Sequence, residues 1–146
     1  MKVQFYILNT SDEKLISHFV CQLTEKIFKK NHRILIQLTS TERLDSYDDQ
    51  LWEFNPDSYI PHLKDVEVIN ENTNSPIVLT CNHNYQSNKL DIILSLDSSY
   101  ITKTGAFNQV LYIIDSTEIN LINARKLFKT YKEKNYQIDT HKIQLQ

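Results

Sequence analysis

Apolar and polar residues alternate over residues 2–8, and these positions are rich in β-branched and aromatic types, so the pattern predicts a strand. Apolar residues then recur at helical spacing as far as about Lys30, which predicts an amphipathic helix. Ser11 is its predicted N-cap, because the two acidic residues that follow suit the first turn of a helix. Residues 33–38 form a short apolar run typical of a buried strand. Strand, helix and strand at this spacing predict a βαβ unit with a parallel pair and a right-handed crossover.

A second helix is predicted over residues 41–54, with Pro56 ending it and residues 55–62 forming an ordered loop. Its exposed face is acidic, because a single cation, Arg43, is set against five carboxylates: Glu42, Asp45, Asp48, Asp49 and Glu53. We interpret this face as a solvated surface, with a partner site as the alternative.

The rest of the chain continues the same alternation of elements. Residues 70–75 predict a turn or loop, and three further strands are predicted at residues 77–80, 92–96 and 110–114. A final helix is predicted over residues 117–134, followed by an extended tail over residues 136–143. The chain has 146 residues and no internal repeat or linker. It is therefore expected to form a single α/β domain, residues 1–146, with helices against a largely parallel sheet.

The bulk composition is that of a soluble globular domain, with 40% hydrophobic and 23% charged residues. No apolar run approaches the roughly 18 residues that a membrane span needs, and the start of the chain has no signal-peptide layout. Cys21 and Cys81 lie far apart and in no metal-binding or redox spacing, and Cys21 is expected to be a packed, unreactive thiol. We therefore expect a cytoplasmic protein without a disulfide framework.

Charge and glycine content bear on the class of function. The net charge of −2 argues against nucleic-acid binding by the molecule as a whole. Gly105 is the one glycine in the sequence, whereas average usage of roughly 7% would give about ten. Since phosphate-cradling loops need several glycines, we expect no nucleotide-binding loop and no cofactor. The five histidines are scattered, and no catalytic or metal-binding motif is present, so no catalytic or metal-ligating residue is assigned.

The final helix carries a basic face. Between residues 118 and 134, five cations are set against two acids, so the segment is +3 in a chain of net charge −2. At roughly 100° per residue, three cations fall together on one side: Arg125, Lys129 and Lys132. The adjacent side is apolar and is expected to face the sheet: Ala124, Leu127 and Tyr131. Phe128 and Leu121 lie at the boundary between these two sides.

An aromatic ring at the edge of the core, flanked by cations one turn away, suits an apolar group that bears carboxylates. The alternative is a solvated helix end, where the cations favour the helix dipole and Phe128 belongs to the core. The residues alone leave both interpretations open.

Several short segments, in their order and spacing, resemble one protein family. They are Phe5-Tyr6-Ile7-Leu8, Phe19-Val20-Cys21, Arg33-Ile34-Leu35-Ile36, Leu51-Trp52, Ser58-Tyr59-Ile60-Pro61-His62, Asp91-Ile92-Ile93-Leu94-Ser95-Leu96, Ala124-Arg125, Phe128-Lys129, Tyr131 and Asp139-Thr140. The chain resembles the chi subunit of bacterial DNA polymerase III holoenzyme over nearly its full length. The resemblance implies a Rossmann-like α/β domain without nucleotide-binding activity, and a non-catalytic accessory subunit rather than an enzyme.

The resemblance also implies a partner for the final helix, since chi proteins bind the acidic C-terminal tail of single-stranded DNA-binding protein. That tail ends in a phenylalanine. Arg125 would then pair with the terminal carboxylate, and Phe128 with Ile114 would line the apolar pocket. Lys129 and Lys132 would attract the aspartates of the tail. This chain departs from its relatives by carrying Phe128 where they have Tyr, and Leu121 where they have Lys.

A second surface is implied by the resemblance, one that in the family contacts the psi subunit and so links chi to the clamp loader. Its residues here are Trp52, Tyr59, Ile60, Pro61 and His62. From the residues alone, a Trp near a helix end and beside an aromatic loop is either an exposed anchor or ordinary core. DNA would be reached only indirectly, through its binding protein, and no membrane is involved.

Two other classes of function remain as alternatives. One is an enzyme that binds a nucleotide or another small molecule on the Rossmann-like sheet. The other is direct binding of single-stranded DNA through the basic helix, which predicts a steep dependence on salt.

Overall fold

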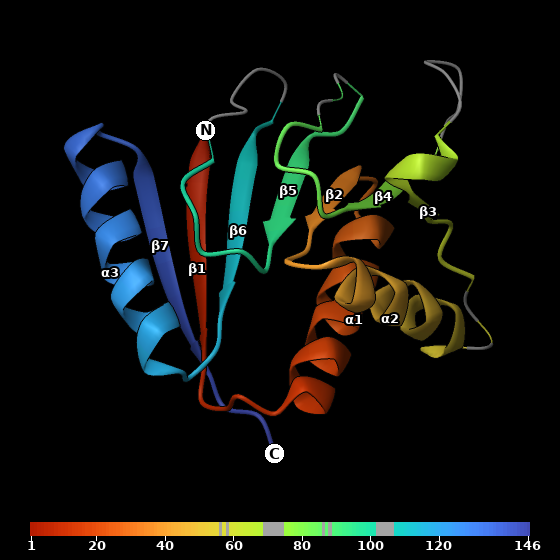
Figure 1. The fold of residues 1–146 in the computed structure, drawn as a ribbon. Helices are drawn as coiled ribbons and strands as arrows, with labels where there is room; N and C mark the ends of the chain where they lie inside the picture. Colours follow the sequence, from red (N-terminus) through yellow and green to blue (C-terminus); the bar gives the residue numbers. More distant parts are fainter. Residues whose placement is uncertain (56, 58, 69–74, 86, 88, 102–106) are drawn as a thin grey trace.

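A computed structural model of the chain describes residues 1–55, 57, 59–68, 75–85, 87, 89–101 and 107–146. Seven strands form one sheet in the order β3-β4-β2-β5-β6-β1-β7, and every neighbouring pair is parallel. The strands are β1 (Lys2–Leu8), β2 (Ile34–Gln37), β3 (Leu63–Lys64), β4 (Ile77–Thr80), β5 (Ile92–Ser95), β6 (Gln109–Ile114) and β7 (Gln137–Ile143). The helices are α1 (Glu13–Lys29), α2 (Thr41–Glu53) and α3 (Glu118–Glu133), with a short 3₁₀ turn, η1 (Asp65–Glu67). The predicted Rossmann-like α/β class is confirmed (Figure 1).

The direction of each connection decides which face its helix covers. The connections through α1 and α2 run from β1 toward the β3 edge, whereas the connection through α3 runs from β6 to the opposite edge at β7. Because such crossovers are right-handed, α1 and α2 lie on one face and α3 on the other. The two cores agree: Ile16 of α1 and Leu44 of α2 belong to one buried cluster, and Leu127 of α3 belongs to another.

The central strands β2, β4 and β5 are predicted well from the sequence because they are fully buried. Every residue of β2, β4 and β5 is buried, and a strand covered on both faces reads as a continuous apolar run. The predicted strand at residues 77–80 coincides with β4, and those at 33–38 and 92–96 contain β2 and β5. These parts of the prediction are confirmed.

Two local predictions differ from the structure. Asp12, not Ser11, is the N-cap of α1, because its carboxylate accepts a hydrogen bond from the Lys14 N–H at 2.9 Å and a carboxylate also suits the helix dipole. The predicted tail at residues 136–143 is extended, but it is also a full strand, β7, paired with β1 along its whole length. Strand β3 and turn η1 are not predicted, because two or three residues carry no periodicity.

Parts of some predictions lie outside the described residues. They include Pro56 as the end of the second helix, Ser58 within the predicted loop, residues 70–74 of the predicted turn, and Gly105. In the part of the chain that the structure describes, no helix is both long and apolar enough to cross a membrane.

Helix α3 ends in a way that leads directly into β7. Asn135 has a positive φ of 63°, the left-handed conformation that usually follows a helix C-terminus. Its N–H donates to the Lys132 carbonyl at 3.0 Å, and the Tyr136 N–H donates to the Tyr131 carbonyl at 3.1 Å. The rings of Tyr131 and Tyr136 then contact each other edge to face at 5.5 Å. These bonds and contacts form a Schellman motif, so the turn itself fixes β7 beside α3.

Candidate functional site

Helix α3 divides its residues between the sheet and solvent as the helical spacing predicts. The side toward the sheet is buried: Ala124, Leu127 and Tyr131. The three cations of the predicted basic face are exposed: Arg125, Lys129 and Lys132. Phe128 lies between these two sides and is 39% exposed. The structure therefore leaves an aromatic ring open to solvent beside the basic face.

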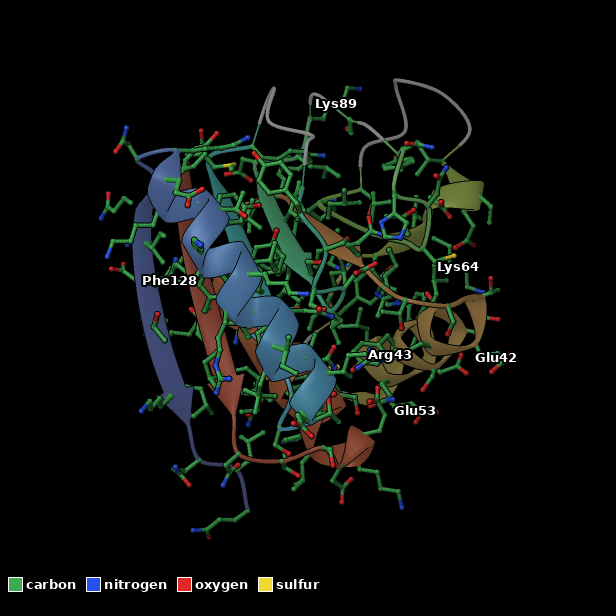
Figure 2. All side chains as sticks on the ribbon, turned by 60° about the vertical axis from the view of Figure 1, so that its left-hand side comes forward. Glu42, Arg43, Glu53, Lys64, Lys89 and Phe128 are labelled. Atoms are coloured by element: carbon green, nitrogen blue, oxygen red, sulfur yellow. The ribbon has the colours of Figure 1, made fainter. Side chains whose placement is uncertain are left out.

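The ring of Phe128 lies on the side of α3 that faces the edge strand β7 (Figure 2). Its centroid is 6.2 Å from that of Phe5 on β1, and Phe5 pairs with Thr140 on β7. Lys132 Nζ lies 6.0 Å from the centroid of the Phe128 ring, at the outer range of a cation–π contact. The Phe128 ring thus packs against Phe5 of the sheet and has the Lys132 ammonium group beside it.

Ile114 and Leu121 contribute at different depths. Ile114 ends β6, is 1% exposed and belongs to the core beneath α3. Leu121 is partly buried and packs against the same core. A bound group can therefore contact Leu121 directly, whereas Ile114 can only support the floor from beneath.

Two residues of β7 join this surface, and neither stands out in the sequence. Successive side chains of a strand point to opposite faces, and Phe5 lies on the face that α3 covers. Thr140 pairs with Phe5 and Lys142 with Ile7, so both point to this face, and both are exposed. The alternation of side chains along residues 136–143 would have identified Thr140 and Lys142 only if the pairing of this segment with β1 had been known. The α3–β7 surface comprises Ile114, Leu121, Arg125, Phe128, Lys129, Lys132, Thr140 and Lys142.

A carboxylate fixes the N-terminal end of α3. Asp115 Oδ1 accepts hydrogen bonds from the Thr117 N–H at 3.0 Å, the Thr117 hydroxyl at 2.6 Å and the Asn120 side-chain amide at 2.9 Å. Burial alone would raise the pKa of the Asp115 carboxyl, but these hydrogen bonds outweigh it and the pKa is lowered. The first turn of α3 is thereby held directly after β6.

A buried pair of tyrosines fixes the other half of α3. The hydroxyls of Tyr131 on α3 and Tyr112 on β6 lie 2.7 Å apart. The Tyr131 hydroxyl also accepts from the Ile101 N–H at 3.4 Å, and the Tyr112 hydroxyl donates to the Ser99 carbonyl at 3.1 Å. Burial raises the pKa of both phenols, so neither ionises in the physiological range. The basic face therefore stands on a rigidly anchored helix.

The second predicted surface is partly exposed and partly core. Trp52 and Tyr59 are 52% and 63% exposed, and their ring centroids lie 5.3 Å apart. Ile60 and His62 are buried, and Pro61 is partly buried. We call Trp52 and Tyr59 the aromatic pair. In the free chain a partner can contact this pair directly, whereas Ile60 and His62 lie underneath.

His62 supports the aromatic pair from below. Its ring lies 4.7 Å from the Trp52 ring. Nδ1 lies 2.7 Å from the Ile60 carbonyl oxygen, and Nε2 lies 3.1 Å from the Asp48 carbonyl oxygen and 3.2 Å from Asp48 Oδ1. The His62 ring is thus held between the backbone of its own loop and helix α2. Burial raises the pKa of the Asp48 carboxyl, while His62 and Lys64 act in the opposite direction.

Two features of the described structure do not suit a nucleotide site. The carboxylate of Asp12 occupies the N-terminus of α1, where a phosphate would bind. A cavity of about 100 Å³ lies at the carboxyl ends of β2 and β5, lined by Gln37, His83, Ser95 and Tyr100 among others. Small-molecule pockets usually measure about 300–1,000 Å³, so this cavity is too small for a nucleotide. Within the described residues, no group of three His, Cys, Asp or Glu side chains could hold a metal ion.

Comparison with solved structures supports the fold. The chain is similar to T4 UvsW, with a TM-score of 0.70 and 10% identity, over 98% of this chain and 41% of that one. It is also similar to domain 2 of the DEAD-box helicase Mss116p bound to an RNA duplex, with a TM-score of 0.66 and 11% identity, over 97% of this chain and 64% of that one. At such low identity these likenesses establish the fold alone.

Comparison of sequences establishes the family. The model of the family described as DNA polymerase III chi subunit, HolC, matches residues 1–139. The DNA polymerase III subunit chi of Pseudomonas aeruginosa is 21% identical over 142 residues, covering 97% of this chain and 96% of that protein. The subunits chi of Haemophilus influenzae and Escherichia coli are also 21% identical, each over 140 residues and more than nine-tenths of both chains. The chain therefore belongs to the family of DNA polymerase III chi subunits, which gives it an accessory role in DNA replication.

Proposed function

We propose that this subunit binds the acidic C-terminal tail of single-stranded DNA-binding protein on its α3–β7 surface. The observation that carries the proposal is the open ring of Phe128, packed on the sheet and bordered by exposed cations. A terminal aromatic residue of the tail would pack against this ring and Leu121. Its α-carboxylate would pair with Arg125, and Lys129 and Lys132 would attract the aspartates.

The physics of the surface suits such a ligand. Hydrogen bonds between a guanidinium and a carboxylate are about twice as strong as neutral ones. Phe128 and Leu121 would hold the aromatic ring of the terminal residue, which carries the carboxylate. Exposed lysines contribute mainly through long-range attraction, which salt screens over a Debye length of about 10 Å at 0.1 M. This chain has Leu121 where its relatives have Lys, so one cation is missing from the surface. Lys142 on β7 supplies a cation to the same surface and offsets that loss.

The aromatic pair supports the second half of the proposal, a link to the clamp loader through the psi subunit. Among the large hydrophobic residues that are exposed in the described part of the chain, three are aromatic: Trp52, Tyr59 and Phe128. Each of the three falls on one of the two proposed partner surfaces. An exposed Trp beside an exposed Tyr is typical of a protein-binding hot spot.

The two surfaces lie at opposite edges of the sheet, and Figure 2 shows Phe128 at one end of the molecule and Glu42 and Glu53 of α2 at the other. Six strand spacings of about 4.8 Å separate β7 from β3 by roughly 29 Å. Both partners can therefore bind at once, and the subunit acts by tethering, which raises the concentration of the clamp loader near exposed template. This cytoplasmic, non-catalytic role is part of the proposal.

A pull-down tests the tail assignment. The subunit should retain intact single-stranded DNA-binding protein and fail to retain a version that lacks its last few residues. Equal retention of both versions would contradict the proposal. The psi assignment is tested with Trp52→Ala, which should weaken psi binding and leave retention of the DNA-binding protein unchanged.

The alternative of a nucleotide-binding enzyme is tested by thermal shift against a set of nucleotides. A ligand at 100 times its Kd adds about 2.7 kcal/mol to the free energy of unfolding, so binding would raise Tm measurably. Direct binding of single-stranded DNA would instead show steep salt dependence without any protein tail present.

A further inference from the structure

The exposed side of α2 carries two carboxylates that no described residue of the chain neutralises. Asp45 pairs with Lys64 at 3.0 Å, and Asp48 Oδ1 lies 3.2 Å from His62 Nε2. Asp49 and Glu53 are exposed and form no ion pair with any described residue. At roughly 100° per residue, Asp49 lies about 60° and Glu53 about 100° from Trp52 around the helix, both on the same side of it.

The cation of α2 does not relieve this charge, because Arg43 turns toward α1. Its Nε donates to Glu13 Oε1 at 2.9 Å and its Nη2 donates to Glu13 Oε2 at 3.1 Å. The last turn of α2 contains no basic residue, and Glu53 ends the helix. A carboxylate at a helix C-terminus opposes the helix dipole. The end of α2 thus keeps negative charge where the fold itself would favour a cation.

The aromatic pair lies at this same end. The faces of Trp and Tyr rings attract cations, and a planar guanidinium can stack on such a ring while pairing with a nearby carboxylate. His62 packs against Trp52 on the protein side, where its Nε2 lies 3.2 Å from Asp48 Oδ1. The outer surface of the pair therefore combines exposed aromatic area with unpaired negative charge.

We propose that the surface formed by the aromatic pair, Asp49 and Glu53 receives a basic, arginine-bearing segment of a partner protein, with an arginine stacked on Trp52 or Tyr59. This inference rests on the proposed use of the surface for a partner subunit and names the chemistry of that partner. An acidic segment would meet like charge here. Lysine fits less well, because it cannot stack and pair with a carboxylate at the same time.

A pair of short amphipathic peptides tests the inference, both with leucine at the same positions, one with arginine and the other with glutamate at the polar positions. Fluorescence anisotropy of the labelled peptides measures binding to the full chain at low salt. The arginine peptide should bind, and the glutamate peptide should not. Trp52→Ala should raise the Kd of the arginine peptide by about tenfold or more. Asp49→Asn with Glu53→Gln should raise it by roughly threefold to tenfold.

The matched control is Glu118→Gln with Glu133→Gln, which removes the same charge from α3 and should leave the Kd unchanged. Equal binding of the two peptides, or unchanged binding to the Asp49→Asn, Glu53→Gln variant, would overturn the inference. Assaying the same variants against the psi subunit separates the two proposals. If Trp52→Ala loses psi while the charge variant keeps both psi and peptide, the partner surface stands and the basic partner is ruled out. If the arginine peptide behaves as expected but psi does not bind, only the psi assignment fails.

Discussion

At the scale of single residues, two polar side chains position the two surfaces. His62 Nε2 lies 3.1 Å from the Asp48 carbonyl oxygen on α2, and the His62 ring packs against Trp52. Asp115 collects three hydrogen bonds at the start of α3. The sequence does not show these roles, because neither residue has a motif or a periodic position. Cys21 is the opposite case: it is predicted as a packed thiol, and it is buried, with burial raising its pKa to about 12.

Asp115 makes the stability of the subunit depend on pH in acid. Its pKa in the folded state lies below the ordinary value of 3.8, so the unfolded chain binds more protons as the pH falls. The stability it contributes is fully present above the ordinary carboxyl pKa and is lost as the pH falls through the lowered, folded-state pKa. Asp115→Asn should therefore cost roughly 1 kcal/mol at pH 7 and much less near pH 3. Urea unfolding at both pH values measures this, and an equal cost at the two would contradict it.

At the scale of elements, hydrophobic periodicity predicted every strand and helix that buries a regular face. It placed α1, α2 and α3 within a few residues, because each has an apolar stripe. It predicted residues 136–143 only as an extended tail, because the pairing of β7 with β1 joins residues that lie more than 130 positions apart. The cation of Lys142 was missed for the same reason. Thr140 was missed with it. The residues of this surface on α3 were predictable from helical spacing, because they lie on a single helix, and Ile114 on β6 was implied by the family resemblance.

The link from α3 to β7 depends on a left-handed residue. Asn135 adopts a φ of 63° without being glycine. Most residues with a side chain pay roughly 1–2 kcal/mol in this conformation, and Asn pays less. Asn135→Ala should therefore lower the free energy of unfolding by about 1 kcal/mol, whereas Asn135→Gly should leave it unchanged or raise it. Chemical denaturation of both variants measures this; equal losses for Ala and Gly would show that the side chain of Asn135, not its backbone conformation, matters.

At the scale of the whole molecule, the two surfaces carry opposite charge. Helix α2 has five acids and one cation, a net charge of −4, whereas α3 has four cations and two acids, a net charge of +2. The basic helix α3 would attract an acidic tail and repel a basic segment, and the acidic helix α2 would do the reverse. The net charge of −2 for the chain conceals this separation, which became visible only when the sheet order placed α2 and α3 apart.

The most direct test of the account is a titration of the subunit with a peptide copy of the acidic tail of single-stranded DNA-binding protein. Arg125→Ala should raise the Kd by roughly tenfold to a hundredfold, since a hydrogen bond to a charged group is worth about 1.5–3 kcal/mol. Lys126→Ala is the matched control, because Lys126 is also exposed but lies on another side of α3. The Kd of this variant should match that of the wild type. Full affinity after Arg125→Ala, or no binding by the wild type, would contradict the account.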